Sequence, residues 1–284
     1  MPPSSDKTAI DKPGADKPVT DKNVVHSVAK GLRVLEAFTA DAPELVLAEV
    51  ARRTGSDNAT AFRLLNTLVM LGYVERVPGG RAFRLTLKCL DLGFNAIART
   101  ELRDLARPIL RALVGEVNEA ASVGVLEGPE IVYIERIQAG LTRLGVDIRI
   151  GSHVPVYSTA IGHAILAFLP RETQVQVLES RPRPKLTEHT PTDLTELLAR
   201  FEAVRARGYA VSDQETVSGL RVLSAPVLDA DGTPVAGLSV AAPAFRMPLA
   251  AFEAAARDPV LAAAAALARA LRAAGGVAVQ VGHG

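Results

Sequence analysis

Two helical segments joined by a very short connection constrain the fold of this 284-residue chain most strongly. The first, Leu47–Thr54, ends at Gly55, a residue type that readily adopts the left-handed conformation found at helix C-termini. Ser56 then predicts the N-cap of the next helix, and Asp57 lies at the positive end of its dipole. A preceding amphipathic segment that begins at Val24 predicts a third helix. The pattern therefore predicts a three-helix unit with one tight turn.

The residues after this unit predict a β-hairpin. Tyr73–Val77 and Arg81–Leu85 alternate between apolar and polar residues, and Pro78-Gly79-Gly80 between them is a turn sequence. From Val24 to Lys88, nine Lys or Arg residues stand against six Asp or Glu residues, a net charge of +3. Helix, turn, helix and basic hairpin together predict a winged helix whose modest positive charge is compatible with DNA binding.

The helix after Ser56 has two faces of different chemistry. Ala61, Leu65 and Leu68 share one face, while small and hydrogen-bonding side chains surround Arg63 on the other. The second face suits the major groove of double-stranded DNA, because bulky or acidic residues would block base edges or repel phosphates. An ordinary solvated face is the alternative. The residues expected to contact DNA are Arg33, Asn58, Ala59, Thr60, Arg63, Asn66, Arg76, Arg81 and Arg84.

The second half of the chain alternates between predicted strands and helices. Ala121–Leu126 and Ile131–Ile137 predict one hairpin, Val222–Leu228 and Val235–Ala241 predict another, and Leu144–Ile150 predicts a further strand. The predicted helices are Leu102–Asn118, Ser158–Leu169, Pro191–Arg207 behind a Thr190 cap, and Pro248–Leu271. Hairpins outnumber parallel crossovers, so the predicted fold class is α+β, with an antiparallel sheet flanked by helices.

The apolar spacing of Leu87–Leu102 predicts a helix between the two halves; packing against its own domain alone is the simpler alternative to a role in dimer formation. The two ends of the chain predict little structure. Asp-Lys pairs repeat through the first 23 residues among Pro, Gly and Thr, a composition typical of a disordered tail. The expected organisation is a tail over 1–23, a winged helix over 24–86, a linker helix over 87–102, a second domain over 103–274 and a flexible tail over 275–284.

Composition excludes several classes of protein. The formal net charge of the whole chain is only +1, so attraction to a polyanion has to come from a local patch. The single cysteine, Cys89, excludes an internal disulfide framework and is expected to be a small buried hydrophobe. An uninterrupted apolar segment of eighteen residues is missing, so neither membrane insertion nor secretion is expected and the predicted location is cytoplasmic.

The residue pattern argues against catalysis. Ser158, His163 and Asp213 are the residue types of a hydrolytic triad, but the chain lacks a G-x-S-x-G segment. Ser158 and His163 are five residues apart on one predicted helix, a spacing that turns them onto different faces. The histidines lack paired metal-ligand spacing, and glycine loops for phosphates are missing, so we expect no metal and no cofactor. His163 is expected on a helix surface or as a buried hydrogen-bonding residue.

Six motifs along the chain follow a common order and spacing: Ala48–Gly55, Arg63–Leu68, Leu71–Arg76, Tyr157–Gly162, Arg207–Tyr209 and Gly219–Arg221. By these motifs the chain resembles the IclR family of transcriptional regulators. The resemblance covers nearly everything except the tails. Two positions depart from the family pattern. Asp57-Asn58-Ala59-Thr60 stands where the family usually has Pro-Lys-Ser-Thr, and His163 stands where it usually has Lys.

The resemblance implies a GAF-like effector-binding domain, a linker helix that contributes to a dimer interface, and a homodimer or a dimer of dimers. Matching the family's effector-contacting positions gives Leu144, Val146, Tyr157, Thr159, Ala160, Ile161, Asp213, Val222, Ser239 and Ala241. Backbone N–H groups of Ala160 and Ile161 at a helix start would favour a carboxylate, so an organic acid is the expected ligand. Core packing is the alternative role for each of these residues.

The expected function is a ligand-responsive regulator that senses a small organic acid and changes its binding to operator DNA. Tyr157 and Ile161 suit an aromatic body, and the residues from Asn118 to Ile134 are similar to family members that sense aromatic acids. Two other classes stay open. One is a small-molecule sensor that acts through a protein partner without specific DNA binding, and the other is an enzyme that turns over the ligand.

Overall fold

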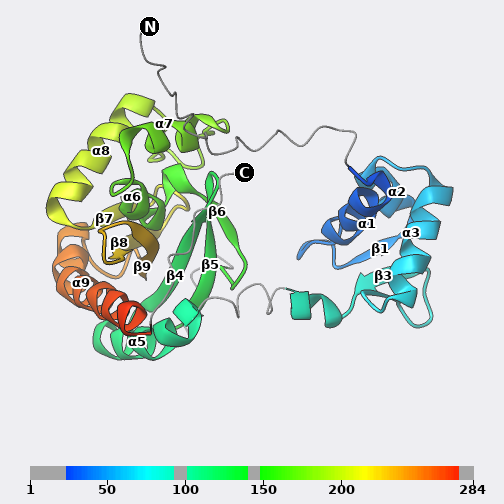
Figure 1. Ribbon diagram of the computed structural model, residues 1–284, viewed down its shortest axis with the longest axis horizontal. Coiled ribbons are helices and arrows are strands. Elements are labelled where there is room, and N and C mark those ends of the chain that lie inside the picture. The colour runs from blue at the N-terminus through cyan, green and yellow to red at the C-terminus, as the bar shows by residue number, and fades with distance from the viewer. Residues whose placement is uncertain (1–23, 93–100, 140–147, 275–284) are drawn as a thin grey trace, which may run out of the picture. The chain divides into compact units, whose positions relative to one another are not determined.

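The computed structural model describes residues 24–92, 101–139 and 148–274 of the chain. The chain divides after Leu92 into two compact units (Figure 1). None of the helices in these described ranges combines the length and the apolar character that a membrane crossing requires.

The N-terminal unit is a winged helix. Its elements in chain order are α1 (His26–Glu36), β1 (Glu44–Val46), α2 (Leu47–Thr54), α3 (Asn58–Met70), β2 (Val74–Arg76) and β3 (Ala82–Leu85). The three strands form an antiparallel sheet in the order β1-β3-β2. Strand β1 was not predicted; it pairs Leu45 with Phe83, and both side chains are buried in the core with Val34, Val50 and Leu65.

The turn between α2 and α3 follows the prediction in one respect and corrects it in another. Gly55 has a φ of 63°, the left-handed conformation that its position at the end of α2 requires. The N-cap of α3 is Asp57 and not Ser56. The carboxylate of Asp57 accepts a hydrogen bond from the Thr60 backbone N–H at 2.8 Å, which satisfies one of the free donors of the first turn.

The C-terminal unit confirms the predicted α+β class. One antiparallel sheet has the strand order β6-β5-β4-β9-β8-β7. Its strands are β4 (Ala120–Glu127), β5 (Glu130–Ile137), β6 (His153–Pro155), β7 (Ala210–Asp213), β8 (Leu220–Leu228) and β9 (Pro234–Pro243). The helices are α5 (Glu101–Val117), α6 (Ala160–Leu166), α7 (Arg171–Glu179), α8 (Leu194–Arg207) and α9 (Leu249–Ala273), and a 3₁₀ turn (Val156–Ser158) precedes α6.

The sheet separates two hydrophobic cores. Helices α5 and α9 cover one face, where Leu110 and Leu267 pack with Leu238 of β9. Helix α6 covers the other face, and α8 packs against α6 from outside (Figure 1). Ile161 and Phe201 lie in that second core. Burial on both faces explains why β9 is apolar over almost its whole length.

Two predictions for this unit need correction, and two elements were missed. Ile148–Ile150 are not in a strand, while 144–147 lie outside the described residues; the edge strand is β6 instead. Helix α8 begins at Leu194 behind Asp193, because the Thr190 hydroxyl accepts bonds from the Leu186 and Thr187 amides. Helix α7 and strand β7 were not predicted.

The structure describes only part of the predicted linker helix and neither of the tails. Residues 88–92 are helical, as the linker prediction requires, while 93–100 and both tails lie outside the described residues. Cys89 is half-buried, and its Sγ lies 3.4 Å from the Tyr73 carbonyl oxygen, so it is less enclosed than expected.

Candidate nucleic-acid interface and effector cavity

Helix α3 presents its first two turns to solvent. Asn58, Ala59 and Arg63 are exposed, and the Arg63 side chain makes neither a hydrogen bond nor an ion pair within the described part of the chain. Thr60 is half-buried, and its backbone N–H and its hydroxyl both donate to the Asp57 carboxylate, at 2.8 Å each. The same contacts hold the pKa of the Asp57 carboxyl below its usual value. Asp57 is thus engaged as the helix cap.

Two of the arginines predicted to contact DNA from the hairpin are held by partners within the winged helix. Arg76 donates to the Asn66 side-chain oxygen at 3.1 Å and lies over the ring of Phe83. Arg84 forms ion pairs with Glu75 at 2.6 Å and Glu44 at 3.8 Å. These contacts fix both guanidinium groups along the sheet of the winged helix.

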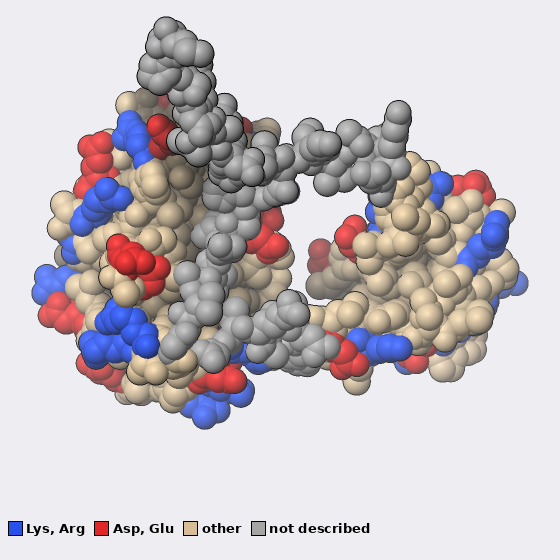
Figure 2. Space-filling model, in the orientation of Figure 1, with Lys and Arg blue, Asp and Glu red and all other residues tan. Residues whose placement is uncertain are grey.

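Arg81 and Arg33 differ from those two residues. Both are exposed and unpaired within the described residues, Arg81 at the turn between β2 and β3 and Arg33 on α1. Figure 2 shows acidic and basic side chains interspersed over the visible surface, in agreement with the small net charge. The positive character of the winged helix therefore comes from a few exposed arginines.

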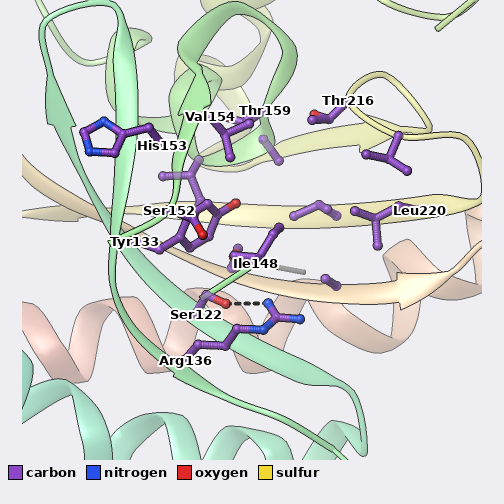
Figure 3. Close-up of a pocket in the computed structure, with 16 residues that line it drawn as sticks. Ser122, Tyr133, Arg136, Ile148, Ser152, His153, Val154, Thr159, Thr216 and Leu220 are labelled. Atoms are coloured by element: carbon purple, nitrogen blue, oxygen red, sulfur yellow. Dashed lines mark hydrogen bonds between the residues drawn. The ribbon is translucent and has the colours of Figure 1, made fainter. Parts of the chain in front are cut away.

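A cavity of about 250 Å³ lies between α6 and the sheet of the C-terminal unit (Figure 3). Six of the ten residues predicted to bind an effector line it: Thr159, Ala160, Ile161, Val222, Ser239 and Ala241. A dry cavity of about 150 Å³ accommodates benzene. The volume here therefore suits a molecule with one substituted ring.

The remaining four predicted residues are placed elsewhere. Tyr157 is buried, and its hydroxyl donates to the Pro184 carbonyl oxygen at 2.7 Å, away from the cavity. Asp213 is half-buried and pairs with Arg221, with 2.7 Å between its carboxylate oxygen and Nε. Neither residue lines the cavity. Leu144 and Val146 lie outside the described residues.

Other polar residues line the cavity that the sequence analysis did not identify. They are Ser122, Tyr133, Arg136, Ser152, His153 and Thr216. Figure 3 shows Arg136 and Ser122 at one end and Thr159 and Thr216 at the opposite end. Burial raises the pKa of Tyr133 to about 12, so its hydroxyl remains protonated at neutral pH.

A β-bulge explains why Arg136 faces the cavity. Gly124 of β4 pairs with Tyr133, and the adjacent Val123 pairs with Glu135, so Ile134 is an extra residue in β5. Strict alternation after Tyr133 would place Glu135 on the cavity side. The extra residue reverses this phase, and Glu135 instead pairs with Arg103 of α5 at 3.2 Å. The alternation of apolar and polar residues in β5 does not indicate where this bulge lies.

The triad residue types do not form a catalytic arrangement. The Ser158 hydroxyl donates to the Pro155 carbonyl oxygen at 3.3 Å, and His163 Nε2 lies 2.6 Å from the Tyr157 carbonyl oxygen. A carbonyl oxygen only accepts, so Nε2 carries the proton. Of the two roles expected for His163, it has that of a buried hydrogen-bonding residue and does not lie on a helix surface. Within the described ranges, no group of His, Cys, Asp and Glu could hold a metal ion.

A winged helix and, in the same chain, an antiparallel sheet domain with a cavity between its sheet and a helix define a ligand-responsive DNA-binding transcriptional regulator. Residues 27–78 match the IclR helix-turn-helix domain, and residues 94–269 match the C-terminal domain of bacterial IclR transcriptional regulators. The chain belongs to the IclR family. The matched domains are those of transcriptional regulators and not of enzymes.

Individual relatives agree with this assignment. The chain is 35% identical over 214 residues to the Pca regulon regulatory protein of Pseudomonas putida, covering 75% of this chain and 73% of the relative. A transcriptional regulator of Rhodococcus sp. RHA1 is similar in structure, with a TM-score of 0.79 and 36% identity, covering 88% of this chain and 100% of that one. An IclR homologue of Microbacterium hydrocarbonoxydans, solved in complex with 4-hydroxybenzoate, has a TM-score of 0.74 and 25% identity, covering 87% and 99%.

Proposed function

We propose that this regulator senses a small aromatic acid in the cavity beneath α6 and changes its binding to operator DNA in response. The single observation that carries the proposal is the cavity itself, whose volume of about 250 Å³ fits one substituted ring. Apolar side chains of Ile148, Ile161 and Val222 offer contacts for such a ring. The 4-hydroxybenzoate complex of the Microbacterium homologue supports the same ligand class.

The mechanism is a shift between populations. An effector that binds one arrangement of the DNA-binding domains better than another favours that arrangement, and so changes operator occupancy. In the proposed complex Asn58, Ala59, Thr60, Arg63 and Asn66 of the α3 segment face base edges. The residues that meet phosphates or the minor groove are Arg33, Arg76, Arg81 and Arg84.

We also propose that the protein acts as a homodimer or a dimer of dimers. Val28 and Leu32 of α1 are 60% and 52% exposed, and Leu71 after α3 is 52% exposed. Exposed apolar side chains of this kind form a surface that a second copy would cover. Two copies would place two α3 helices in successive major grooves of a pseudo-palindromic operator.

Fluorescence anisotropy tests the proposed function. The purified protein is titrated onto labelled DNA from immediately upstream of its own gene and from neighbouring promoters, over a salt series, with aromatic and short-chain acids added. We expect salt-dependent, sequence-selective binding that one aromatic acid changes. Absence of selective binding on every fragment would favour the sensor that acts through a protein partner.

Replacing Arg63 by Ala is expected to reduce specific binding by about 10-fold or more while leaving non-specific binding nearly unchanged, because a base contact carries roughly 1–3 kcal/mol of discrimination. Anisotropy on operator and scrambled DNA measures both affinities. Arg81→Ala is the matched control: loss of a phosphate contact should weaken binding to both DNAs alike and lower the salt slope by about one. An equal loss on both DNAs for Arg63→Ala would exclude its base-reading role.

A further inference from the structure

Arg136 is a partly buried cation at one end of the cavity. One guanidinium nitrogen, Nη1, donates to the Ser122 hydroxyl oxygen at 2.9 Å. Its Nε is buried and has no hydrogen-bond partner within the described residues. Such a donor has lost its hydrogen bond with water without gaining another, which is unfavourable.

The surroundings of Arg136 do not neutralise its charge. Neither Asp nor Glu is among the described residues that line the cavity. Glu135, its neighbour in β5, points to the other face of the sheet, where it pairs with Arg103 and Arg107 at 3.2 and 3.8 Å. Burial lowers the pKa of Arg136, but an arginine remains charged at neutral pH. The cavity therefore holds a positive charge without a counter-ion from the described part of the chain.

Hydroxyl groups continue from Arg136 across the sheet. Arg136 of β5 pairs in register with Ser122 of β4, and Ser122 pairs in register with Ser239 of β9. Partners in adjacent strands lie on the same face, and all three residues line the cavity. An anion beside Arg136 would thus find both a charged donor and hydroxyl donors.

At the opposite end of the cavity, both threonine hydroxyls have hydrogen-bond partners within the protein. The Thr159 hydroxyl accepts from the Gly162 backbone N–H at 2.9 Å, as the cap of the seven-residue helix α6. The Thr216 hydroxyl donates to the Ser158 carbonyl oxygen at 2.5 Å. The hydroxyl hydrogen of Thr216 is thus already committed within the protein, whereas Arg136 Nε is not.

We propose that Arg136 is the residue that anchors the carboxylate of the effector, with its guanidinium group donating to a carboxylate oxygen and the apolar body lying against Ile148, Ile161 and Val222. The inference rests on the proposed function and specifies its ligand: a small monocarboxylic acid that points its charge toward the Arg136–Ser122 end. This orientation differs from the one expected from the start of α6, where the carboxylate would lie beside Ala160.

Isothermal titration of the full-length protein with 4-hydroxybenzoate and its neutral counterpart 4-hydroxybenzamide tests the inference. Arg136→Met removes the charge and the donors while keeping an unbranched side chain. We expect it to weaken binding of the acid by about 10- to 100-fold, the range for a hydrogen bond to a charged group. Binding of the amide should change by less than about threefold, because the amide carries no charge for Arg136 to complement.

Arg181→Met is the matched control. Arg181 is also an arginine of the C-terminal unit, but it is exposed and pairs with Glu130 outside this cavity. The Arg181→Met variant should bind the acid and the amide with the same affinities as the wild-type protein. Arg136→Lys provides a second test if Arg136→Met does not fold. It replaces the planar group by a point charge, so we expect an intermediate loss for the acid alone.

The outcomes separate the inference from the proposed function. Unchanged binding of 4-hydroxybenzoate to Arg136→Met overturns the role of Arg136 and leaves acid sensing intact. An equal loss for acid and amide also overturns it, since that result indicates a damaged cavity. Failure of the wild-type protein to bind 4-hydroxybenzoate overturns the proposed aromatic-acid class, and the carboxylate anchor with it.

Discussion

Replacing Gly162 by Ala is expected to lower the free energy of unfolding by about 3 kcal/mol or more, because a Cβ at this position overpacks a buried site. The added carbon would lie 2.1 Å from the Val156 carbonyl oxygen and 2.7 Å from Val156 Cγ2. Both residues are buried, and Gly162 is further fixed by donating to the Thr159 hydroxyl. The nearest obstacle is backbone, which cannot move aside as a flexible side chain could.

Gly115→Ala is the control for this prediction. Gly115 lies inside α5, and a Cβ there would meet no atom of the described structure within 4 Å. Helix propensity alone favours Ala over Gly by about 1 kcal/mol, so this variant should be as stable as the wild type or slightly more stable. Urea denaturation of both variants gives the comparison. Equal stability of Gly162→Ala and the wild type would show that the 3₁₀ turn before α6 moves freely.

Acidification is expected to destabilise the protein through His163. Burial lowers the pKa of His163 from 6.5 to about 4 in the folded state, and the Nε2 proton is held by the Tyr157 carbonyl. Phe201 packs against the ring, with 5.5 Å between centroids, and Arg200 and Arg207 disfavour the charged form further.

The direction of the pH effect follows from the two protonation states. Below pH 6.5 the unfolded chain binds a proton at His163 that the folded protein does not bind until about pH 4. The stability from the neutral histidine is therefore complete above the unfolded pKa, and it falls as the pH drops from 6.5 toward 4. The expected loss is about 2 kcal/mol between roughly pH 7 and pH 5, and about 3 kcal/mol once the pH is below both values.

Chemical denaturation at several pH values measures this loss. His163→Gln keeps an N–H donor near the position of Nε2 but does not titrate, so it should lack this part of the pH dependence even if it is less stable at neutral pH. An identical change of unfolding free energy with pH in the wild type and His163→Gln would assign the acid sensitivity to other groups.

Local sequence signals predicted the winged helix well because each signal has its own physical cause. Gly55 marks the end of α2 through its left-handed backbone, and Pro78-Gly79-Gly80 marks the turn of the hairpin. Strands β1 and β6 have three residues each and, unlike the equally short β2, are not joined to their partner strand by a hairpin turn that would mark them. Both are formed by pairing with residues distant in the sequence, Phe83 for β1 and Ile131 for β6.

The cavity could be predicted only in part, for a related reason. Thr159, Ala160 and Ile161 follow each other at the start of α6, so one motif locates all three. Tyr157 and Asp213 were assigned to the cavity by resemblance, but side-chain direction decides where they point. Arg136 was missed because its direction depends on a bulge whose partner residues lie on another strand.

The bulge at Ile134 suggests how such a cavity could change the charge of the ligand that it prefers. Glu135 and Arg136 are neighbours of opposite charge, and one extra residue in β5 decides which of them the ligand would meet. A one-residue slip of this strand segment would exchange them and turn a cationic end into an acidic one. The backbone spacing of β5 therefore decides the sign of charge at this end of the cavity, together with the side chains themselves.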